Sequence, residues 1–281
     1  MGVLSLFKGN KSAAAVTSDG RLGVVKEYLD SEQISFTHGH TGGDMNATGP
    51  RTFVIADIHG CYSTFCALLD QITLTREDEL YLLGDYIDRG PDSKEVVELI
   101  MKLQADGFAV MPIMGNHEQM LLDSIEPTTL QKKRDWILNG GLATLLSYGV
   151  SKPDDLPEEH IAFFRALPMY IATDSHIFVH GALDLTLREP FGRKGHDAML
   201  WDRECSGNLK KLKGKIVVSG HTPRGLEEIS NSLHSQHVQI DNGCFWGLAF
   251  PDMGNLIAWE LTSGELVVQP CLPHDASLQV E

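Results

Sequence analysis

From residue 51 onward, apolar positions follow two alternating patterns. Short runs rich in β-branched residues are typical of buried strands, and they occupy residues 51–57, 78–85 and 108–116. The segments after these runs carry apolar side chains at helical spacing, over residues 61–72, 91–108 and 117–125. The repeated order of strand and helix predicts an α/β fold with a largely parallel sheet covered on both faces.

Two of the expected helices have a clear apolar face. The first face is formed by Phe65, Leu68, Leu69 and Ile72, and the second by Val96, Val97, Ile100 and Leu103. Asp92, with Glu95 three positions later, forms a capping-box pattern at the start of the second helix, and Gly107 is placed to end it.

Residues 1–50 differ from the rest of the chain. Gly, Ser, Thr and Asn dominate them, with one short helix predicted over residues 21–33 and a glycine-rich stretch after it. We interpret residues 1–50 as an appendage and linker without a core, and residues 51–281 as one domain that contains the core. His38 and His40 could be taken for a metal pair, but solvated histidines in a linker are the favoured interpretation.

Composition narrows the classes of function. No apolar run approaches the roughly 20 residues of a membrane-spanning helix. The net charge of −15 argues against nucleic acid or an anionic membrane as a partner. The five cysteines are scattered and contain no CxxC pair, which is typical of a reducing compartment. The N-terminus fits neither an export signal nor the myristoylation pattern, so we expect a cytoplasmic protein.

Each predicted strand in the first half ends in a polar cluster. The clusters read "ADIHG", "GDYIDRG" and "GNHE", and their side chains are Asp57, His59, Asp85, Asp88, Asn116 and His117. Ligands of open α/β sheets bind at the carboxyl ends of the strands, so these side chains should converge on one crevice.

The residue types in these clusters suit a divalent metal. Asp57 and His59 are two positions apart, so in an extended strand end they would point to the same side. The alternative is that Asp57 caps the next helix and His59 packs in the core. Asp85 could bridge two ions with its two oxygens.

The second half adds two imidazoles at strand ends. Residues 174–183 and 214–225 each contain an apolar strand, followed by His180 beside Gly181 and by Gly220 beside His221. Glycine leaves backbone room beside a ligand, which favours metal ligands over plain surface histidines.

Five motifs in this order carry a resemblance to a known family. They are "GCYSTF", "GDYIDRG", "GNHEQM", "VHG" and "GHTP", and over residues 51–262 the chain resembles the phosphoprotein phosphatase branch of the calcineurin-like metallophosphoesterases. "WILNGG" and "WDRE" resemble segments of the bacterial and lambda phage-type enzymes. The resemblance implies a β-sandwich flanked by helices, with the active site at the C-terminal ends of the strands.

The resemblance also implies a dinuclear centre. One ion would be held by Asp57, His59 and Asp85, and the other by Asp85, Asn116, His180 and His221. Asp85 is the bridge, and the two ions would share a hydroxide that attacks phosphorus. Manganese is the expected metal, with iron, zinc and nickel also compatible with these ligands.

The same resemblance assigns the remaining roles. His117 would be the general acid for the leaving oxygen, and Asp88 would orient it. Arg89, Arg203 and Asn116 would bind the phosphoryl oxygens. For Arg203 the alternative is a surface ion pair with Asp202 or Glu204, and Trp201 is expected in the core or as a wall of the site.

Two features depart from the family pattern. Ala182 stands where many relatives have a second glycine, which the intact ligand set should tolerate. The segment "QIDNGCFWGLAF" lacks the tyrosine-bearing stretch of the eukaryotic enzymes, so their inhibitor sensitivity and substrate groove cannot be transferred to this chain.

Three functions follow as hypotheses. The favoured one is a metal-dependent serine/threonine protein phosphatase acting on a phosphorylated protein or peptide, with phosphotyrosine activity left open. The alternative is a dinucleoside polyphosphate hydrolase of the symmetrical diadenosine tetraphosphatase type, whose members typically lack the counterparts of Asp88 and Glu118. A binding module that has lost catalysis would be expected to lack His117 or a metal ligand, and all are present. Oligomeric state is not predicted.

Overall fold

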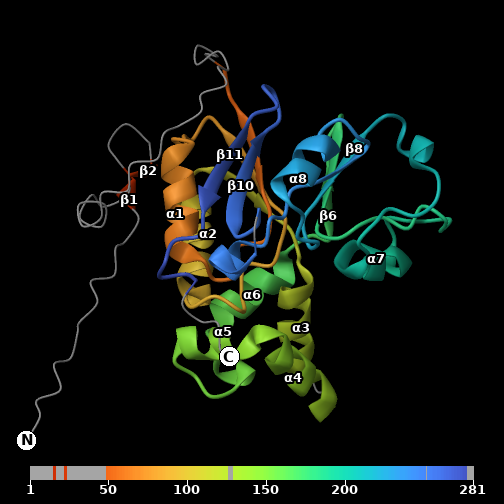
Figure 1. Cartoon of the computed structure of the whole chain (residues 1–281). Coiled ribbons are helices and arrows are strands. Elements are labelled where there is room, and N and C mark those ends of the chain that lie inside the picture. Colours follow the sequence, from red (N-terminus) through yellow and green to blue (C-terminus); the bar gives the residue numbers. More distant parts are fainter. Residues whose placement is uncertain (1–14, 17–21, 24–48, 126–128, 251, 277–281) are drawn as a thin grey trace, which may run out of the picture.

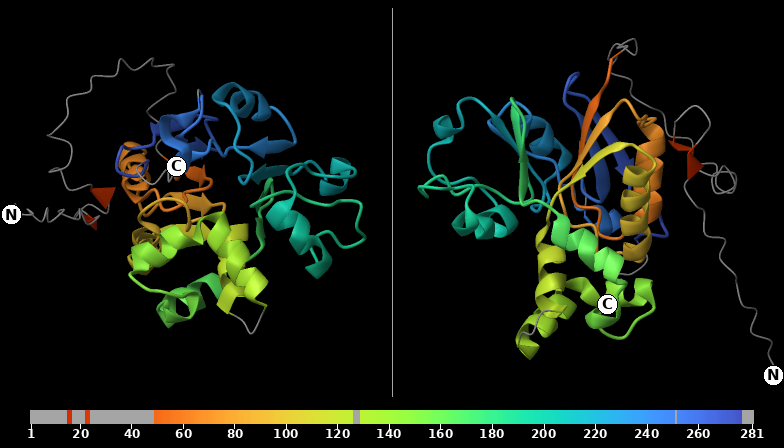
Figure 2. Two further views of the ribbon diagram at one scale, coloured as in Figure 1. Left: turned by 60° about the horizontal axis from the view of Figure 1, so that its bottom comes forward. Right: turned by 180° about the vertical axis from the view of Figure 1, so that it is seen from behind.

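The computed structural model describes residues 15–16, 22–23, 49–125, 129–250 and 252–276. Two main β-sheets face each other, with helices on their outer sides (Figures 1 and 2). Upstream of them, β1 (Ala15–Val16) and β2 (Leu22–Gly23) form a short antiparallel pair. Residues 22–23 of the expected helix over 21–33 are therefore in a strand. The rest of that helix, with His38 and His40, lies outside the described residues.

The first sheet has five strands in the order β11-β10-β3-β4-β5. Its parallel members are β3 (Thr52–Ile55), β4 (Glu79–Leu82) and β5 (Ala109–Pro112). Two antiparallel strands, β10 (Asn255–Glu260) and β11 (Leu266–Pro270), continue the sheet beyond β3. Pro112 lies in edge strand β5, where its missing N–H is tolerated.

The second sheet has four strands in the order β6-β7-β8-β9. Strands β7 (His176–Val179), β8 (Ile216–Ser219) and β9 (His237–Gln239) are parallel, and β6 (Tyr170–Ala172) is antiparallel to β7.

Helices cover the outer sides and one end of the sandwich (Figure 1). The connections within the first sheet are α1 (Tyr62–Gln71) and α2 (Ser93–Ala105). Beside the second sheet, α7 (His196–Trp201) lies on the outer side, whereas α8 (Leu226–Ser232) packs Ile229 into the core between the sheets. The helices α3 (Asn116–Ile125), α4 (Leu130–Trp136), α5 (Leu142–Tyr148) and α6 (Glu158–Ala166) gather at the lower end in Figure 1. A π-helical turn, η2 (Ile137–Gly141), joins α4 to α5. Short 3-10 turns are η3 (Pro153–Asp155), η4 (Arg193–Gly195), η5 (Leu209–Leu212) and η6 (Cys244–Ala249).

The alternation of side chains along β3 explains the layers. Phe53 and Ile55 face outward and pack with Leu68 of α1. Val54 between them faces inward and packs with Phe178 and Val218 of the second sheet. Successive side chains of a strand point to opposite faces, and here both faces are buried.

The predicted α/β sandwich is confirmed, and the three predicted strands form parallel pairs in a sheet covered on both faces, but two features of the sheets were not predicted. The inner face of each sheet is covered by the other sheet, and both sheets contain antiparallel strands. A continuous apolar run shows that both faces of a strand are buried, but it does not show whether a helix or a second sheet covers them.

The apolar faces predicted for the first two helices are confirmed, since all their members are buried. The capping box is not formed. Asp92 precedes α2 but its side chain makes no cap hydrogen bond, and its Oδ2 lies 2.8 Å from Nε2 of His274 instead. Glu95 accepts a hydrogen bond from Ser147 at 3.2 Å.

Register brings the strand ends level with one another. Ile55 of β3 pairs with Leu82 of β4, which pairs with Pro112 of β5. The loops after these three strands therefore leave the sheet at one height and meet at the end where α3 begins. Among the described residues, no helix is long and apolar enough to cross a membrane.

Candidate active site

Loops from both sheets meet at the carboxyl ends of the parallel strands. The backbone N–H of His221, after β8, donates to Asp57 Oδ1, after β3, at 2.9 Å. His180 Nε2, after β7, lies 3.4 Å from Asp85 Oδ1, after β4. The structure thus brings together all six side chains expected to be ligands, namely Asp57, His59, Asp85, Asn116, His180 and His221.

Asp85 has the geometry of a bridge. Its Oδ2 lies 3.4 Å from His59 Nε2, while its Oδ1 lies 3.4 Å from His180 Nε2. Two atoms that bind one ion at about 2.1 Å are roughly 3 to 3.4 Å apart. Oδ2 of Asp85 therefore faces the ligand group that contains His59, and Oδ1 faces the group that contains His180. Burial opposes ionisation of Asp85, but the neighbouring His180, His117 and His59 outweigh it and hold its pKa well below the usual value.

Hydrogen bonds fix which nitrogen of each imidazole faces the cluster. His59 Nδ1 lies 2.9 Å from the carbonyl oxygen of Ile87, and His180 Nδ1 lies 2.8 Å from that of Leu83. A carbonyl only accepts, so Nδ1 carries the proton in both rings and Nε2 presents its lone pair. Burial lowers the pKa of both histidines and so favours the neutral imidazole, which is the form that binds a metal.

Asn116 shows that this site fits a cation. Its Oδ1 lies 2.8 Å from His180 Nε2 and 3.1 Å from Nδ1 of His221. His221 also has a hydrogen bond with the backbone of Trp201, and burial lowers the pKa of His221 to about 4. His180 Nε2 and Asn116 Oδ1 both present lone pairs, so two electron-rich atoms lie 2.8 Å apart, an arrangement that repels unless a positive ion lies between them.

A buried carboxylate that the sequence reasoning did not select joins the cluster. Asp241 follows β9 and is 3% exposed. Burial raises its pKa to about 7. The pKa of Asp57 is raised well above its usual value, mainly by burial and further by the negative charges of Asp241 and Asp85. Asp241 follows a strand end just as Asp57 does, so the same rule could have found it. Together the carboxylates create a negative field that divalent ions would neutralise.

His117 and Asp88 form a buried pair beside the ligands. His117 Nδ1 lies 2.7 Å from Asp88 Oδ2, and His117 Nε2 lies 3.8 Å from Asp85 Oδ2. Asp88 also accepts from Trp136 Nε1 at 2.9 Å and from Thr144 Oγ1 at 2.6 Å. Neither of these last two contacts was expected. The hydrogen bonds fix Asp88, which in turn fixes the ring of His117.

Glu118 builds the turn that carries Asp85. Its carboxylate accepts from the backbone N–H groups of Asp85 at 2.9 Å, Tyr86 at 2.8 Å and Gly115 at 3.1 Å. A Cβ at Gly115 would lie 2.3 Å from Asp85 Oδ1, so only glycine fits there. Glu118 thus positions the backbone of a predicted ligand.

Backbone strain is concentrated at this site. In the described part of the chain, eight residues other than glycine have positive φ, and five of them are His59, Asp85, Asp88, Arg89 and His221. Such conformations persist only where the surroundings enforce them, which is typical of functional sites. The expectation that Asp57 and His59 share one side of an extended strand end is wrong, because His59 lies in a turn with φ of 48°. The two still approach, with Asp57 Oδ2 and His59 Nε2 4.0 Å apart.

Arg89 reaches the ligand cluster. Its Nη1 lies 2.8 Å from His59 Nε2, and its guanidinium lies over the ring of Phe245 at 4.5 Å. A Cβ at Gly140, in the "WILNGG" segment, would lie 2.8 Å from Arg89 Cγ, so this glycine leaves room for the arginine. The phosphate-binding role of Arg89 stays a prediction.

Arg203 lies farther out. Its side chain is exposed, and its backbone carbonyl accepts a hydrogen bond from Gln239 Nε2 at 2.7 Å. Its charge contributes to the lowered pKa of His221, although burial and the charge of His180 contribute more. Glu204 pairs with Arg224. Trp201 is 46% exposed and meets the His221 ring edge-on at 6.3 Å, so it is a wall and not part of the core.

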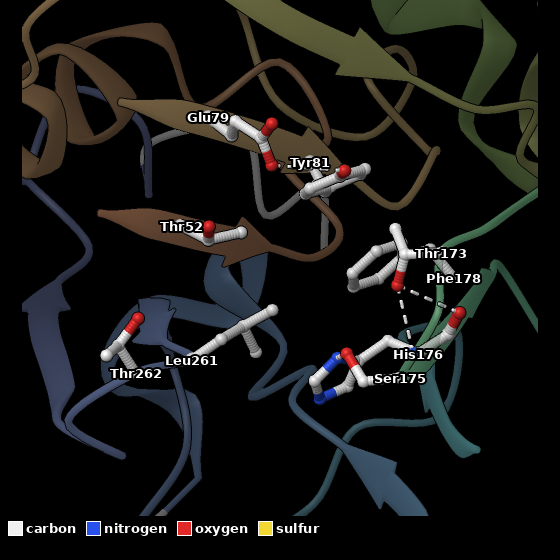
Figure 3. Close-up of a pocket in the computed structure, with 9 residues that line it drawn as sticks. All are labelled: Thr52, Glu79, Tyr81, Thr173, Ser175, His176, Phe178, Leu261 and Thr262. Atoms are coloured by element: carbon white, nitrogen blue, oxygen red, sulfur yellow. Dashed lines mark hydrogen bonds between the residues drawn. The ribbon is translucent and has the colours of Figure 1, made fainter. Parts of the chain in front are cut away.

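A cavity of about 310 Å³ lies at the other end of the sandwich (Figure 3). Its wall includes Thr52 and Glu79, which begin β3 and β4, and His176, which begins β7. The predicted catalytic side chains follow the opposite ends of these strands, and none of them lines this cavity. It is therefore separate from the candidate active site.

Comparisons with known proteins agree with this geometry. Residues 50–239 match the family model described as calcineurin-like phosphoesterase. The chain is 28% identical over 206 residues to serine/threonine-protein phosphatase 2 of Salmonella typhimurium, covering 69% of this chain and 87% of that protein. It is 48% identical over 71 residues to a symmetrical bis(5'-nucleosyl)-tetraphosphatase of Wigglesworthia glossinidia brevipalpis. That match covers 25% of this chain and 25% of the relative's length.

A similar fold is found among solved structures. A protein serine/threonine phosphatase from Saccharomyces cerevisiae superposes with a TM-score of 0.58 at 16% identity, over 82% of each chain. This likeness shows the fold alone, and the described residues contain His and Asp clusters that could hold metal ions.

Proposed function

This chain belongs to the calcineurin-like phosphoesterase family, and on that premise we propose that it is a metal-dependent phosphatase of phosphoserine and phosphothreonine in proteins or peptides. One observation carries the proposal: His117 Nδ1 lies 2.7 Å from buried Asp88, with its ring beside bridging Asp85. A serine alkoxide is a poor leaving group, so its release needs a positioned proton donor.

The ligand set accommodates two divalent ions, and we expect manganese to support activity. When bound, these ions would supply Lewis-acid activation of water and of the phosphoryl oxygens. Asp57, His59 and Asp85 would hold one ion, while Asp85, Asn116, His180 and His221 would hold the other.

The protein's own groups move the proton and hold the substrate. His117 Nδ1–H donates to Asp88 and Nε2 is directed toward the cluster, so that a second proton carried on Nε2 can pass to the leaving oxygen. Arg89 lies beside His59 and can hold non-bridging phosphoryl oxygens with paired hydrogen bonds. Arg203 would approach the same oxygens from the rim.

The long match to a serine/threonine phosphatase supports this substrate class, since it covers most of both chains.

A second candidate is a dinucleoside polyphosphate hydrolase. The short, stronger matches to symmetrical tetraphosphatases favour it, and exposed Trp201 beside His221 offers a surface on which a base could stack. Glu118 stabilises the turn that carries Asp85, a role that both candidate functions would need. The presence of Glu118 therefore distinguishes a protein phosphatase from a tetraphosphatase less well than the presence of Asp88 does.

A substrate panel tests the proposal. Purified, manganese-loaded protein is assayed with phosphoserine and phosphothreonine peptides and with diadenosine tetraphosphate, and Asp85→Asn serves as the inactive control. We expect kcat/KM to be at least tenfold higher for the phosphopeptides than for diadenosine tetraphosphate. Chelation of the metal should abolish turnover of both substrates. Preferential symmetrical cleavage of the dinucleotide would overturn the phosphatase assignment in favour of the second candidate.

A further inference from the structure

Three of the five cysteines meet next to the candidate active site. Cys61 precedes α1, Cys244 begins η6, and Cys271 follows β11. Their Sγ atoms all lie within 4.8 Å of one another. Cys61 and Cys244 are 0% and 1% exposed, and Cys271 is half-buried. We call these three residues the thiol cluster.

The surroundings of the thiol cluster leave a buried carboxylate oxygen without a partner. Asp275, 1% exposed, accepts through Oδ2 from the backbone N–H and the hydroxyl of Thr64, both at 2.6 Å. Its Oδ1 is buried and has no hydrogen-bond partner. Asp275 interacts electrostatically with Cys244 and Cys271, so it lies close to the cluster. A buried unpaired carboxylate oxygen is costly unless a cation or proton meets it.

We propose that Cys61, Cys244 and Cys271 bind a thiophilic divalent ion, with Zn²⁺ as the expected ion and Asp275 as a nearby buried carboxylate whose charge favours a cation. Sulfur binds zinc at about 2.3 Å, so thiolates sharing one ion are roughly 3.8 Å apart, within the spacing seen here. On binding, each thiol gives its proton to solvent, and no electron is transferred. A disulfide would leave one of the three sulfurs out and would need an oxidant.

This site is distinct from the dinuclear centre but is connected to it. Cys61 follows His59 by two positions, and Phe245 follows Cys244 directly. The Phe245 ring meets the His59 ring edge-on at 5.1 Å and lies under the Arg89 guanidinium. An ion on the thiol cluster would therefore tie together the His59 loop, the Phe245 turn and the end of β11. The inference holds whichever phosphate ester is the substrate.

Cobalt spectroscopy of the full chain tests the inference. Cobalt bound by thiolates gives an intense near-ultraviolet charge-transfer band, which cobalt bound only by His, Asp and Asn lacks. We expect the wild-type protein to show this band and Zn²⁺ to displace it. Cys271→Ser and Cys244→Ser should lose most of it. Cys205→Ser, a half-buried cysteine outside the cluster, and Asp85→Asn, at the dinuclear centre, should retain it.

A second measurement needs no variant. Alkylation of the native, reduced protein followed by mass spectrometry should show Zn²⁺ protecting Cys271 at least tenfold, with Cys205 unaffected. The inference is overturned if the wild-type protein shows no charge-transfer band, or if zinc does not slow alkylation of Cys271. It is also overturned if the protein purified without reductant has a disulfide within the thiol cluster.

Discussion

Replacing Asp88 by asparagine isolates the charge behind His117. Asp88 Oδ2 accepts from His117 and Trp136, and Oδ1 accepts from Thr144. An asparagine with its oxygen toward His117 keeps the first two contacts. Its amide group then faces Thr144 Oγ1, whose hydroxyl can turn to Ser93 Oγ, 3.2 Å away. The hydrogen-bonded geometry can therefore survive while the negative charge is removed.

The magnitude of the effect follows from that lost charge. A hydrogen bond to a charged group contributes about 1.5–3 kcal/mol and a neutral one about 0.5–1.5, a difference of roughly 1–2 kcal/mol. The Coulomb energy of two unit charges about 4 Å apart, at an effective dielectric constant near 20, is about 4 kcal/mol and sets the upper limit. The expected loss in kcat for a phosphoserine peptide is therefore about 5- to 1000-fold.

The assay compares two leaving groups. Turnover of a phosphoserine peptide should fall by the full factor in Asp88→Asn, whereas turnover of para-nitrophenyl phosphate should fall less, because its leaving group needs little protonation. Bound metal should be unchanged. Asp78→Asn is the matched control, since Asp78 is also buried but pairs with Arg51 away from the site.

Equal losses on the two substrates, with metal content intact, would show that the pair of His117 and Asp88 does not protonate the leaving oxygen. The control should leave the ratio of the two activities at its wild-type value.

Four further outcomes are expected. Asp85→Asn should abolish turnover and lower the bound metal, measured by elemental analysis, because Asp85 faces both ligand groups. Arg203→Ala should reduce kcat/KM by about 2–4 kcal/mol equivalent without changing Tm or metal content, and unaltered kinetics would remove Arg203 from the site. A protein lacking residues 1–49 should hydrolyse aryl phosphates at the wild-type rate, since all predicted site residues lie downstream. Burial opposes ionisation of Asp78, but hydrogen bonds from Arg51 outweigh it and lower its pKa below 3.8. Its pairing therefore adds stability above about pH 3.8, and the Tm difference between wild type and Asp78→Asn should disappear as the pH falls below that value.

Much of the candidate site could be predicted from local sequence. Apolar runs that end in Asp57, Asp85, Asn116, His180 and His221 mark the carboxyl ends of strands, and parallel strands present those ends at one edge. The register of β3, β4 and β5 then follows from matching buried faces. The convergence of these side chains thus depended only on strand periodicity and chain direction.

Other features depended on packing between distant segments. Trp136 and Thr144 hold Asp88 from helices that the strand pattern does not describe. Cys61 and Cys271 are far apart in the sequence and meet only because β10 and β11 return to the first sheet.

The sequence by itself determined the first three pairs of strand and helix, the faces of these elements that are buried, and the polar residues at their strand ends, because these properties depend on residues close together in the chain. The tertiary structure alone decided that a second sheet covers the first and that His59 and Asp85 adopt positive φ. It also decided that Asp241 joins the ligand cluster and that three scattered thiols share one site. These outcomes depend on contacts between elements far apart in the chain. The amphipathic pattern of one element specifies how much surface must be buried, but not which element buries it.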